Sequence, residues 1–510
     1  MKRLVIATVL ICLVLAGCAG PKRAPLTAGS GPETSYTPPP IAWSKCTDKL
    51  KAYNADCGFL VVPLDYSQPA GMKIKIAVSR INHTVDAGDY QGVVFVNLTS
   101  PGVSSVGQPA FSKLFPDSMT GDYDFIGFDT RGVGASQPAL RCGPTLHGYN
   151  HPAYIPATAQ EQAAWLQTMK DHADDCAKTN SPLLKHVTTL DNVQDMDSLR
   201  KALGQGQISL YGYWYGAYLG EVYSTMYPGR VRRMVFDSSI DPSQVWFGFN
   251  FAQNAPLDQN IAVFCAWVAQ HDNLYHLGTN GAAVEQQYAA TLDKLKKAPA
   301  SGLLGPTVLT DTMLLAYYTK EWEDLARAFS ALVNKADIAP MKSLYDENYP
   351  TTNDNAYAMQ QATECTDAPW PRDWNTWLSA TTKSYQSAPL TTWNNMWFVA
   401  SCQFWSVPAQ QAAPVVDGSK APPILMVLDS TIEPNTTYAG SLAVRKLFPK
   451  AVLVQSGATP AGSNGSDDCS PGKAIVDYLE DGTLPARVAG DTADLKCPAN
   501  PLPDPANAGR

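Results

Sequence analysis

This 510-residue sequence lacks runs of basic residues and closely paired cysteines, and it has no long apolar run besides the one near its N-terminus. The formal charge is −8, and the absence of any basic cluster argues against nucleic acid as a partner. No segment after the N-terminus has the uncharged apolar length of a membrane helix, so we expect a soluble body. Without the cysteine spacing of zinc sites, the sequence predicts no metal centre, and no motif indicates a cofactor.

The N-terminus has the features of an export signal followed by a lipid-attachment site. Two basic residues precede an apolar run over residues 4–16, and small residues stand directly before Cys18. This pattern favours cleavage before Cys18 and lipid attachment there over an ordinary signal peptide with a chance cysteine. It predicts a signal peptide over residues 1–17 and a flexible tether over residues 18–40. The expected location is the extracytoplasmic face of the cell membrane, with the lipid as anchor.

The cysteines agree with export. Eleven are present, of which Cys12 belongs to the signal and Cys18 to the lipid site. An oxidising compartment favours disulfides among the other nine. Sequence alone does not determine connectivity, but nearest-neighbour pairing would join Cys46 to Cys57, Cys142 to Cys176, Cys365 to Cys402 and Cys469 to Cys497. This leaves Cys265, whose apolar, helix-like surroundings favour core burial or a disulfide over a reactive thiol.

Two stretches of strand-like sequence are separated by a long helical one. Apolar runs predict strands over residues 57–63, 73–81, 92–96, 123–129, 231–237, 422–428 and 451–455, and a short one that begins at Ile208. We interpret the first two as edge strands. Strand–helix–strand repetition predicts a mostly parallel sheet with helices on both faces. We expect one core formed by residues 41–244 and 421–500, with an inserted helical lid over residues 245–420.

The central motif is Gly212-Tyr213-Trp214-Tyr215-Gly216, which lies between a predicted strand and a predicted helix. A nucleophile elbow needs glycines on both sides of the nucleophile, because that residue has a strained backbone and the strand and helix approach closely. The spacing and context of an elbow are therefore present. The nucleophilic serine is replaced by Trp214.

Several stretches together resemble one family, the exported tripeptidyl-aminopeptidase-like α/β hydrolases, a serine peptidase group that includes mycobacterial envelope serine hydrolases. The resemblance extends from about Ala42 to Cys497. The stretches are CGFLVVPLDYSQP (57–69), YDFIGFDTRGVGAS (123–136), DMDSLRKALG (195–204), LYGYWYGAYLGEVYSTMYPGRVRRMVFD (210–237), CTDAPWPRD (365–373), SCQFW (401–405) and YLEDGTLPA (478–486). The resemblance implies an α/β-hydrolase fold with a helical lid.

The resemblance also implies where the catalytic residues would lie. The nucleophile position falls on Trp214, the acid position on Glu433 and the histidine position on Pro460. The family's oxyanion strip carries glycines where this chain has Thr99 and Ser100, and Tyr215, directly after the nucleophile position, is the other oxyanion position. No catalytic residue set is therefore intact.

The distribution of histidine leads to the same expectation. All seven histidines precede residue 277, whereas this fold takes its histidine after the last strand. Tyr213 and Tyr215 flank the elbow, but the sequence shows no base to activate a phenol. We interpret Glu433 as a remnant of the family's acid.

Two functions remain open. The first is a pseudoenzyme that binds a peptide, an acyl chain or a protein in the former active-site cleft. The second is an active hydrolase or aminopeptidase with an unrecognised nucleophile. For Trp214 itself, filling of the old pocket is the preferred interpretation, and an aromatic platform for a ligand is the alternative.

Overall fold

The structure is a computed structural model that describes residues 36–505, except 144–145, 150, 180, 350–353, 411, 429, 458–468 and 500. The predicted signal peptide, Cys18 and the histidine position Pro460 lie outside the described residues. Among the helices that are described, none is both long and apolar enough to cross a membrane.

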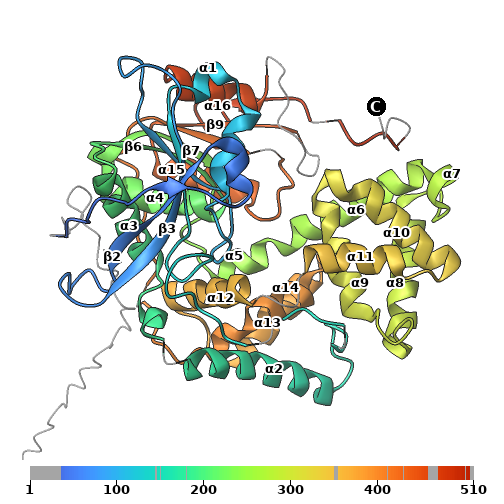
Figure 1. The fold of residues 1–510 in the computed structure, drawn as a ribbon. Helices are drawn as coiled ribbons and strands as arrows, with labels where there is room; N and C mark the ends of the chain where they lie inside the picture. Colours follow the sequence, from blue (N-terminus) through green and yellow to red (C-terminus); the bar gives the residue numbers. More distant parts are fainter. Residues whose placement is uncertain are drawn as a thin grey trace, which may run out of the picture.

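A ten-stranded sheet forms the centre of the fold (Figure 1). Its order is β1-β2-β3-β5-β4-β6-β7-β8-β9-β10. The strands are β1 (Ser44–Lys45), β2 (Asp56–Pro63), β3 (Lys73–Ile81), β4 (Val93–Asn97), β5 (Asp124–Phe128), β6 (Ile208–Tyr213), β7 (Val231–Asp237), β8 (Ile424–Leu428), β9 (Ala451–Gln455) and β10 (Leu495–Lys496). All pairs from β5 to β10 are parallel, and β1, β2 and β3 join the sheet as antiparallel strands.

The prediction that residues 57–63 and 73–81 form edge strands is wrong. Strand β2 lies between β1 and β3, and β3 lies between β2 and β5. The sequence of β3 alternates because Lys73 and Lys75, near its start, are exposed on one face of the sheet. An antiparallel strand inside a sheet can expose one face, so this alternation does not indicate an edge strand. The two-residue strands β1 and β10 are too short to give a sequence signal.

Helices cover both faces of the sheet, because the buried side chains of each strand alternate between two cores. In β4, Phe95 packs into the core that includes α3 (Thr189–Ala202) and α4 (Tyr215–Met226). Val94 and Val96 pack instead with α1 (Asp117–Thr120) and α16 (Pro471–Glu480). The predicted α/β-hydrolase architecture is confirmed. Helix α15 (Tyr438–Leu447) connects β8 to β9 and belongs to the first of these cores through Val444.

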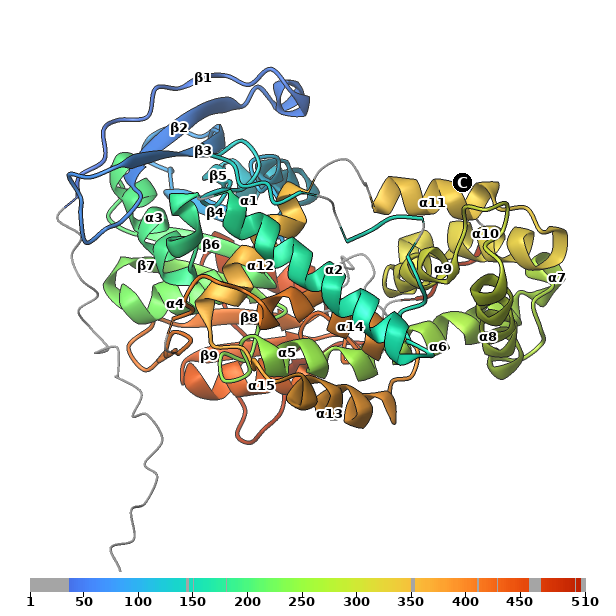
Figure 2. The ribbon, with the colours of Figure 1, turned by 90° about the horizontal axis from the view of Figure 1, so that it is seen from below.

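Between β7 and β8 the described chain is almost entirely helical. The helices are α5 (Phe247–Ala252), α6 (Asn254–Gln270), α7 (Asp272–Tyr275), α8 (Gly281–Lys297), α9 (Pro306–Met313), α10 (Trp322–Lys335), α11 (Ala339–Asn348), α12 (Asn355–Asp367), α13 (Trp374–Tyr385) and α14 (Thr392–Val399). Helices α6 to α11 have a core of their own and lie to one side of the sheet (Figures 1 and 2). Helices α5 and α12 to α14 pack into the main core.

Helix α2 (Ala159–Lys178) comes from the first half of the chain and packs with the helices that lie between β7 and β8. It packs against the 3-10 helix η7 (Ala400–Gln403), and Figure 2 shows it running past α12 and α14. Stacking of Trp165 on Trp397 joins the two segments. The helical cover of the sheet is therefore built from two separate stretches of sequence.

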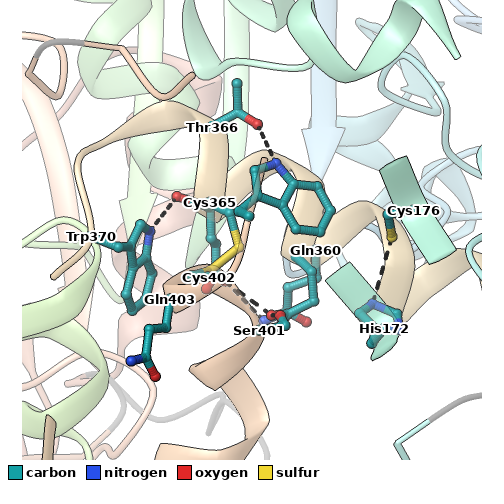
Figure 3. Close-up of a disulfide and its surroundings, with 12 residues drawn as sticks. His172, Cys176, Gln360, Cys365, Thr366, Trp370, Ser401, Cys402 and Gln403 are labelled. Atoms are coloured by element: carbon teal, nitrogen blue, oxygen red, sulfur yellow. Dashed lines mark hydrogen bonds between the residues drawn. A yellow bond between two sulfur atoms is a disulfide. The ribbon is translucent and has the colours of Figure 1, made fainter. Parts of the chain in front are cut away.

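The four disulfides predicted by nearest-neighbour pairing are all present, and Cys265 is a free, buried thiol. Burial raises the pKa of Cys265 to about 12, so this thiol stays protonated and unreactive. Figure 3 shows the Cys365–Cys402 disulfide, which ties α12 to η7. The nearby Trp370 indole donates to the backbone oxygen of Glu364 at 2.8 Å.

Candidate functional site

Trp214 stands at the turn from β6 to α4 with the backbone of an elbow. Its φ is 52° and its ψ is −107°, and its backbone N–H donates to the Asp237 oxygen at 3.0 Å. A Cβ on Gly216 would lie 1.9 Å from the Asn97 oxygen, and one on Gly212 would lie 2.3 Å from backbone atoms of Gly216. Both glycines are therefore required by close backbone contact. The strained turn persists although a tryptophan occupies it.

A cavity of about 250 Å³ lies beside Trp214, under the helical segment. The structure differs here from the filled-pocket interpretation: the indole forms part of the wall, stacked on Phe249 with ring centroids 6.4 Å apart. The other aromatic groups of the wall are Tyr317, Tyr318, Tyr349 and Phe398. Its polar groups are His147, Asn250, Gln253, Asp311, Gln360, Glu364, Asn394, Asn395 and Asn435. No lysine or arginine is among the described residues that line it.

Glu433, at the predicted acid position, is fully buried and bonded to a tyrosine of the helical segment. Both carboxylate oxygens lie 2.8 Å from the Tyr317 hydroxyl, and the backbone N–H of Asn435 donates to Glu433 at 2.9 Å. Tyr317 comes from the 3-10 helix η5 (Leu314–Tyr317), and its hydroxyl also lies 2.6 Å from that of Tyr213. Burial raises the pKa of Glu433 to about 8, so the carboxyl is mostly neutral at pH 7.

The two phenols of this network are poor nucleophiles. Burial, with a further contribution from nearby Glu433, raises the pKa values of Tyr213 and Tyr317 well above 10. Both hydroxyls therefore remain protonated at neutral pH. Tyr215 faces another part of the core, where its hydroxyl contacts Thr189 at 3.1 Å and Asn192 at 3.0 Å.

The residues of the predicted oxyanion strip form hydrogen bonds with one another and with Asp129. The Thr99 hydroxyl donates to the Val103 oxygen at 3.2 Å, and the Val103 N–H donates to the Ser100 oxygen at 3.2 Å. The Ser104 hydroxyl and the Ser105 N–H both donate to Asp129, at 2.6 and 2.7 Å. These side chains stabilise the loop, which is the role that ordinary loop hydrogen bonding predicts.

Two carboxyl groups of the cavity wall gave no signal in the sequence. Glu364, on α12, accepts from the Gln360 amide at 2.9 Å, and burial raises its pKa to about 8. Asp311, on α9, accepts from Tyr154 and Asn394 at 2.8 Å and lies 3.4 Å from the His147 ring. They meet Trp214 only through the packing of the helical segment over the sheet, so no local motif could have identified them.

Comparisons with known proteins agree with this architecture. Residues 100–385 match the family model described as alpha/beta hydrolase fold, and residues 388–496 match the one described as TAP-like protein. The chain is 32% identical to the tripeptidyl aminopeptidase of Streptomyces lividans over 483 residues, which is 91% of this chain and 88% of the relative. It is 29% identical to carboxylesterase B of Mycobacterium tuberculosis (90% and 91% covered) and 25% identical to serine protease Hip1 of the same species (88% and 90% covered).

Proposed function

Because the chain belongs to the α/β-hydrolase family, we propose that its cavity binds a ligand that the protein does not hydrolyse. One observation carries the proposal: Trp214 occupies the nucleophile position with the elbow backbone intact, and an open cavity remains beside its ring. An indole cannot act as the nucleophile of acyl transfer. The fold is then retained for binding, and the site for catalysis is lost.

The state of Glu433 supports the absence of turnover. In a catalytic triad the carboxylate orients a histidine and stabilises its charged form. Here both oxygens of Glu433 contact Tyr317, and its raised pKa leaves the group mostly uncharged at pH 7. No histidine follows residue 276 in the sequence. A serine alone at position 214 would therefore have no base.

The wall of the cavity favours a ligand that carries an ammonium group, such as the N-terminus of a short peptide. Asp311 supplies a carboxyl group, Glu364 supplies a mostly uncharged carboxyl that can accept a hydrogen bond, and Trp214, Phe249 and Tyr318 offer aromatic faces that attract cations. Side-chain amides can satisfy the N–H and C=O groups of a peptide. These amides already hydrogen-bond within the protein, but an acyl chain could make no further hydrogen bonds to them, which disfavours a lipid ligand.

A lipid on Cys18 would hold this binding protein at the outer face of the membrane. The small residues before Cys18 and the Pro- and Gly-rich stretch over residues 18–40 support this. Labelling of growing cells with an alkyne palmitate analogue, compared with Cys18→Ser, tests the anchor. Labelling that persists in Cys18→Ser would contradict it.

The experiment for function combines a catalytic and a binding measurement. Purified protein is treated with a fluorophosphonate probe and assayed on chromogenic esters and tripeptide anilides, with an active serine hydrolase as positive control. We expect no labelling and no turnover above a heat-treated sample. Isothermal titration with tripeptides and with their N-acetylated forms should show binding of the free amines alone. Turnover would contradict the pseudoenzyme assignment, and equal binding of both forms would contradict the ammonium assignment.

A second candidate function follows from one contact, the hydroxyl of Tyr317 at 2.8 Å from the Glu433 carboxyl. With Glu433 as base, this cavity-lining phenol could act as a nucleophile on an ester or peptide. The raised pKa values of both groups argue against it, since each is mostly protonated at pH 7. Turnover that disappears in Tyr317→Phe would establish this function instead.

A further inference from the structure

Three potential metal ligands lie together at the Cys142–Cys176 disulfide, away from the cavity beside Trp214. The ligand atoms of Cys142, Cys176 and His172 all lie within 4.8 Å of one another, and all three residues are buried. The His172 ring approaches Cys176 from one turn earlier on α2, with Nε2 3.8 Å from Sγ (Figure 3). In the described part of the chain, no other disulfide belongs to such a group.

The two segments that carry these ligands are held in place independently of the disulfide. His172 and Cys176 are four residues apart on one helix, so they share a face. Opposite them, the backbone N–H groups of Cys142 and Gly143 both donate to Asp354, at 2.5 and 2.9 Å. The ring of His172 packs on Tyr357 at a centroid distance of 4.7 Å. Opening of the disulfide would therefore leave the three side chains close together.

A second cavity, of about 360 Å³, adjoins this cluster. His172 and Asp175 are part of its wall, together with His151. A metal site needs an entry path and, with three protein ligands, a fourth position for water or another side chain. This cavity reaches the cluster at His172 and provides an entry path on that side, while neither cysteine is among its described lining residues.

We propose that reduction of the Cys142–Cys176 disulfide creates a zinc site formed by Cys142, Cys176 and His172. A dithiol reductant gives two electrons and two protons to the disulfide and is itself oxidised to a disulfide. Zn²⁺ then displaces the protons of both thiols, releases two protons to solvent, and binds two thiolates and the neutral imidazole. The sulfurs, now bonded, need to separate to about 3.8 Å, as two ligands of a tetrahedral zinc ion do.

The proposed site lies close in sequence to a residue that lines the cavity beside Trp214. His147, five residues later, lines the cavity beside Trp214 and pairs with Asp311. Exchange of a covalent link for a metal link at Cys142 is thus a change five residues before His147 in the sequence. The zinc assignment itself does not depend on the proposed ligand.

The test uses the protein with Cys18→Ser, reduced anaerobically with a phosphine, desalted and titrated with Co²⁺. We expect a charge-transfer band of thiolate-bound Co²⁺ that saturates at one equivalent and disappears on addition of Zn²⁺. The oxidised protein should give no band. Absence of the band in the reduced Cys18→Ser protein, or a band of equal strength in the oxidised protein, would overturn the proposal.

Two variants assign the ligands. His172→Ala keeps both cysteines and should lower the Co²⁺ affinity at least about tenfold. The double change Cys46→Ser and Cys57→Ser removes another disulfide and should leave the titration unchanged. Alkylation followed by mass spectrometry should show Zn²⁺ protecting Cys142 and Cys176 alone. Unchanged affinity in His172→Ala, or protection of other cysteines, would contradict the site.

Discussion

The hydroxyl of Tyr317 lies 2.8 Å from both carboxylate oxygens of Glu433. A side chain of the inserted helices thus hydrogen-bonds to Glu433, the predicted acid position, which in a catalytic triad would contact a histidine. This contact joins the helical segment to the core and occupies the carboxyl at the same time. The proposed loss of catalysis therefore involves more than the replacement of one serine.

Tyr317→Phe should destabilise the protein by about 1–3 kcal/mol, because it leaves the buried Glu433 carboxyl without one partner. Denaturant unfolding measures the change. The matched control is Tyr318→Phe, since Tyr318 is partly exposed and its ring lies next to that of Tyr317. Equal losses in the two variants would show that the hydrogen bond to Glu433 contributes nothing particular.

Stability should fall as pH rises from about 5 to 8. Burial raises the pKa values of Glu433 and Glu364 to about 8, above their values in the unfolded chain. Between the unfolded and folded pKa values the native state holds more protons than the unfolded state, so rising pH favours unfolding. One such group contributes at most about 1.4 kcal/mol per pH unit.

Urea unfolding at several pH values, with Glu364→Gln and Glu433→Gln beside the wild type, tests this. Each glutamine keeps the shape of the side chain and removes the titration. The slope of stability against pH should become smaller in each variant and smaller still in the double variant. A slope that glutamine leaves unchanged would assign the pH dependence to other groups.

The fold was largely predictable because most of its central strands are rich in apolar residues. Strand β8, for example, is the apolar run Ile424–Leu428, and β7 and β9 have the predicted bounds although β7 contains two arginines. The elbow was predictable for a local reason too, since Gly212 and Gly216 are required by contacts within the turn and with Asn97. The disulfides followed from sequence proximity.

The cavity was not predictable to the same degree. Tyr317 and Glu364 lie on helices whose sequences give no sign of what they face, and they meet Trp214 only after the helical segment folds back over the sheet. Whether Trp214 fills the pocket also depends on Phe249, which holds the ring against one wall. A side-chain position of this kind is set by packing, which no spacing pattern records.

Trp214→Gly should be more stable than Trp214→Ala by about 1 kcal/mol. Both changes remove the indole and its contact with Phe249, so the loss of packing is the same. They differ at the backbone, where a φ of 52° strains any residue with a Cβ and suits glycine. Thermal unfolding of the pair isolates this strain. Equal stability would mean that the turn relaxes once the ring is removed.

Trp214→Ser alone should remain inactive towards a fluorophosphonate probe, because the restored hydroxyl has no base. The Glu433 carboxyl accepts a hydrogen bond from Tyr317, and the position predicted for the family's histidine carries Pro460. The triple change Trp214→Ser, Pro460→His and Tyr317→Phe supplies the serine and the imidazole and frees the acid, so any recovered labelling should appear there first. The double change without Tyr317→Phe is the matched control, since it differs by one hydroxyl.

Labelling of the single variant would show that another group, such as His147 in the cavity wall, can act as base. Equal labelling of the double and triple variants would show that Tyr317 does not keep Glu433 from a histidine.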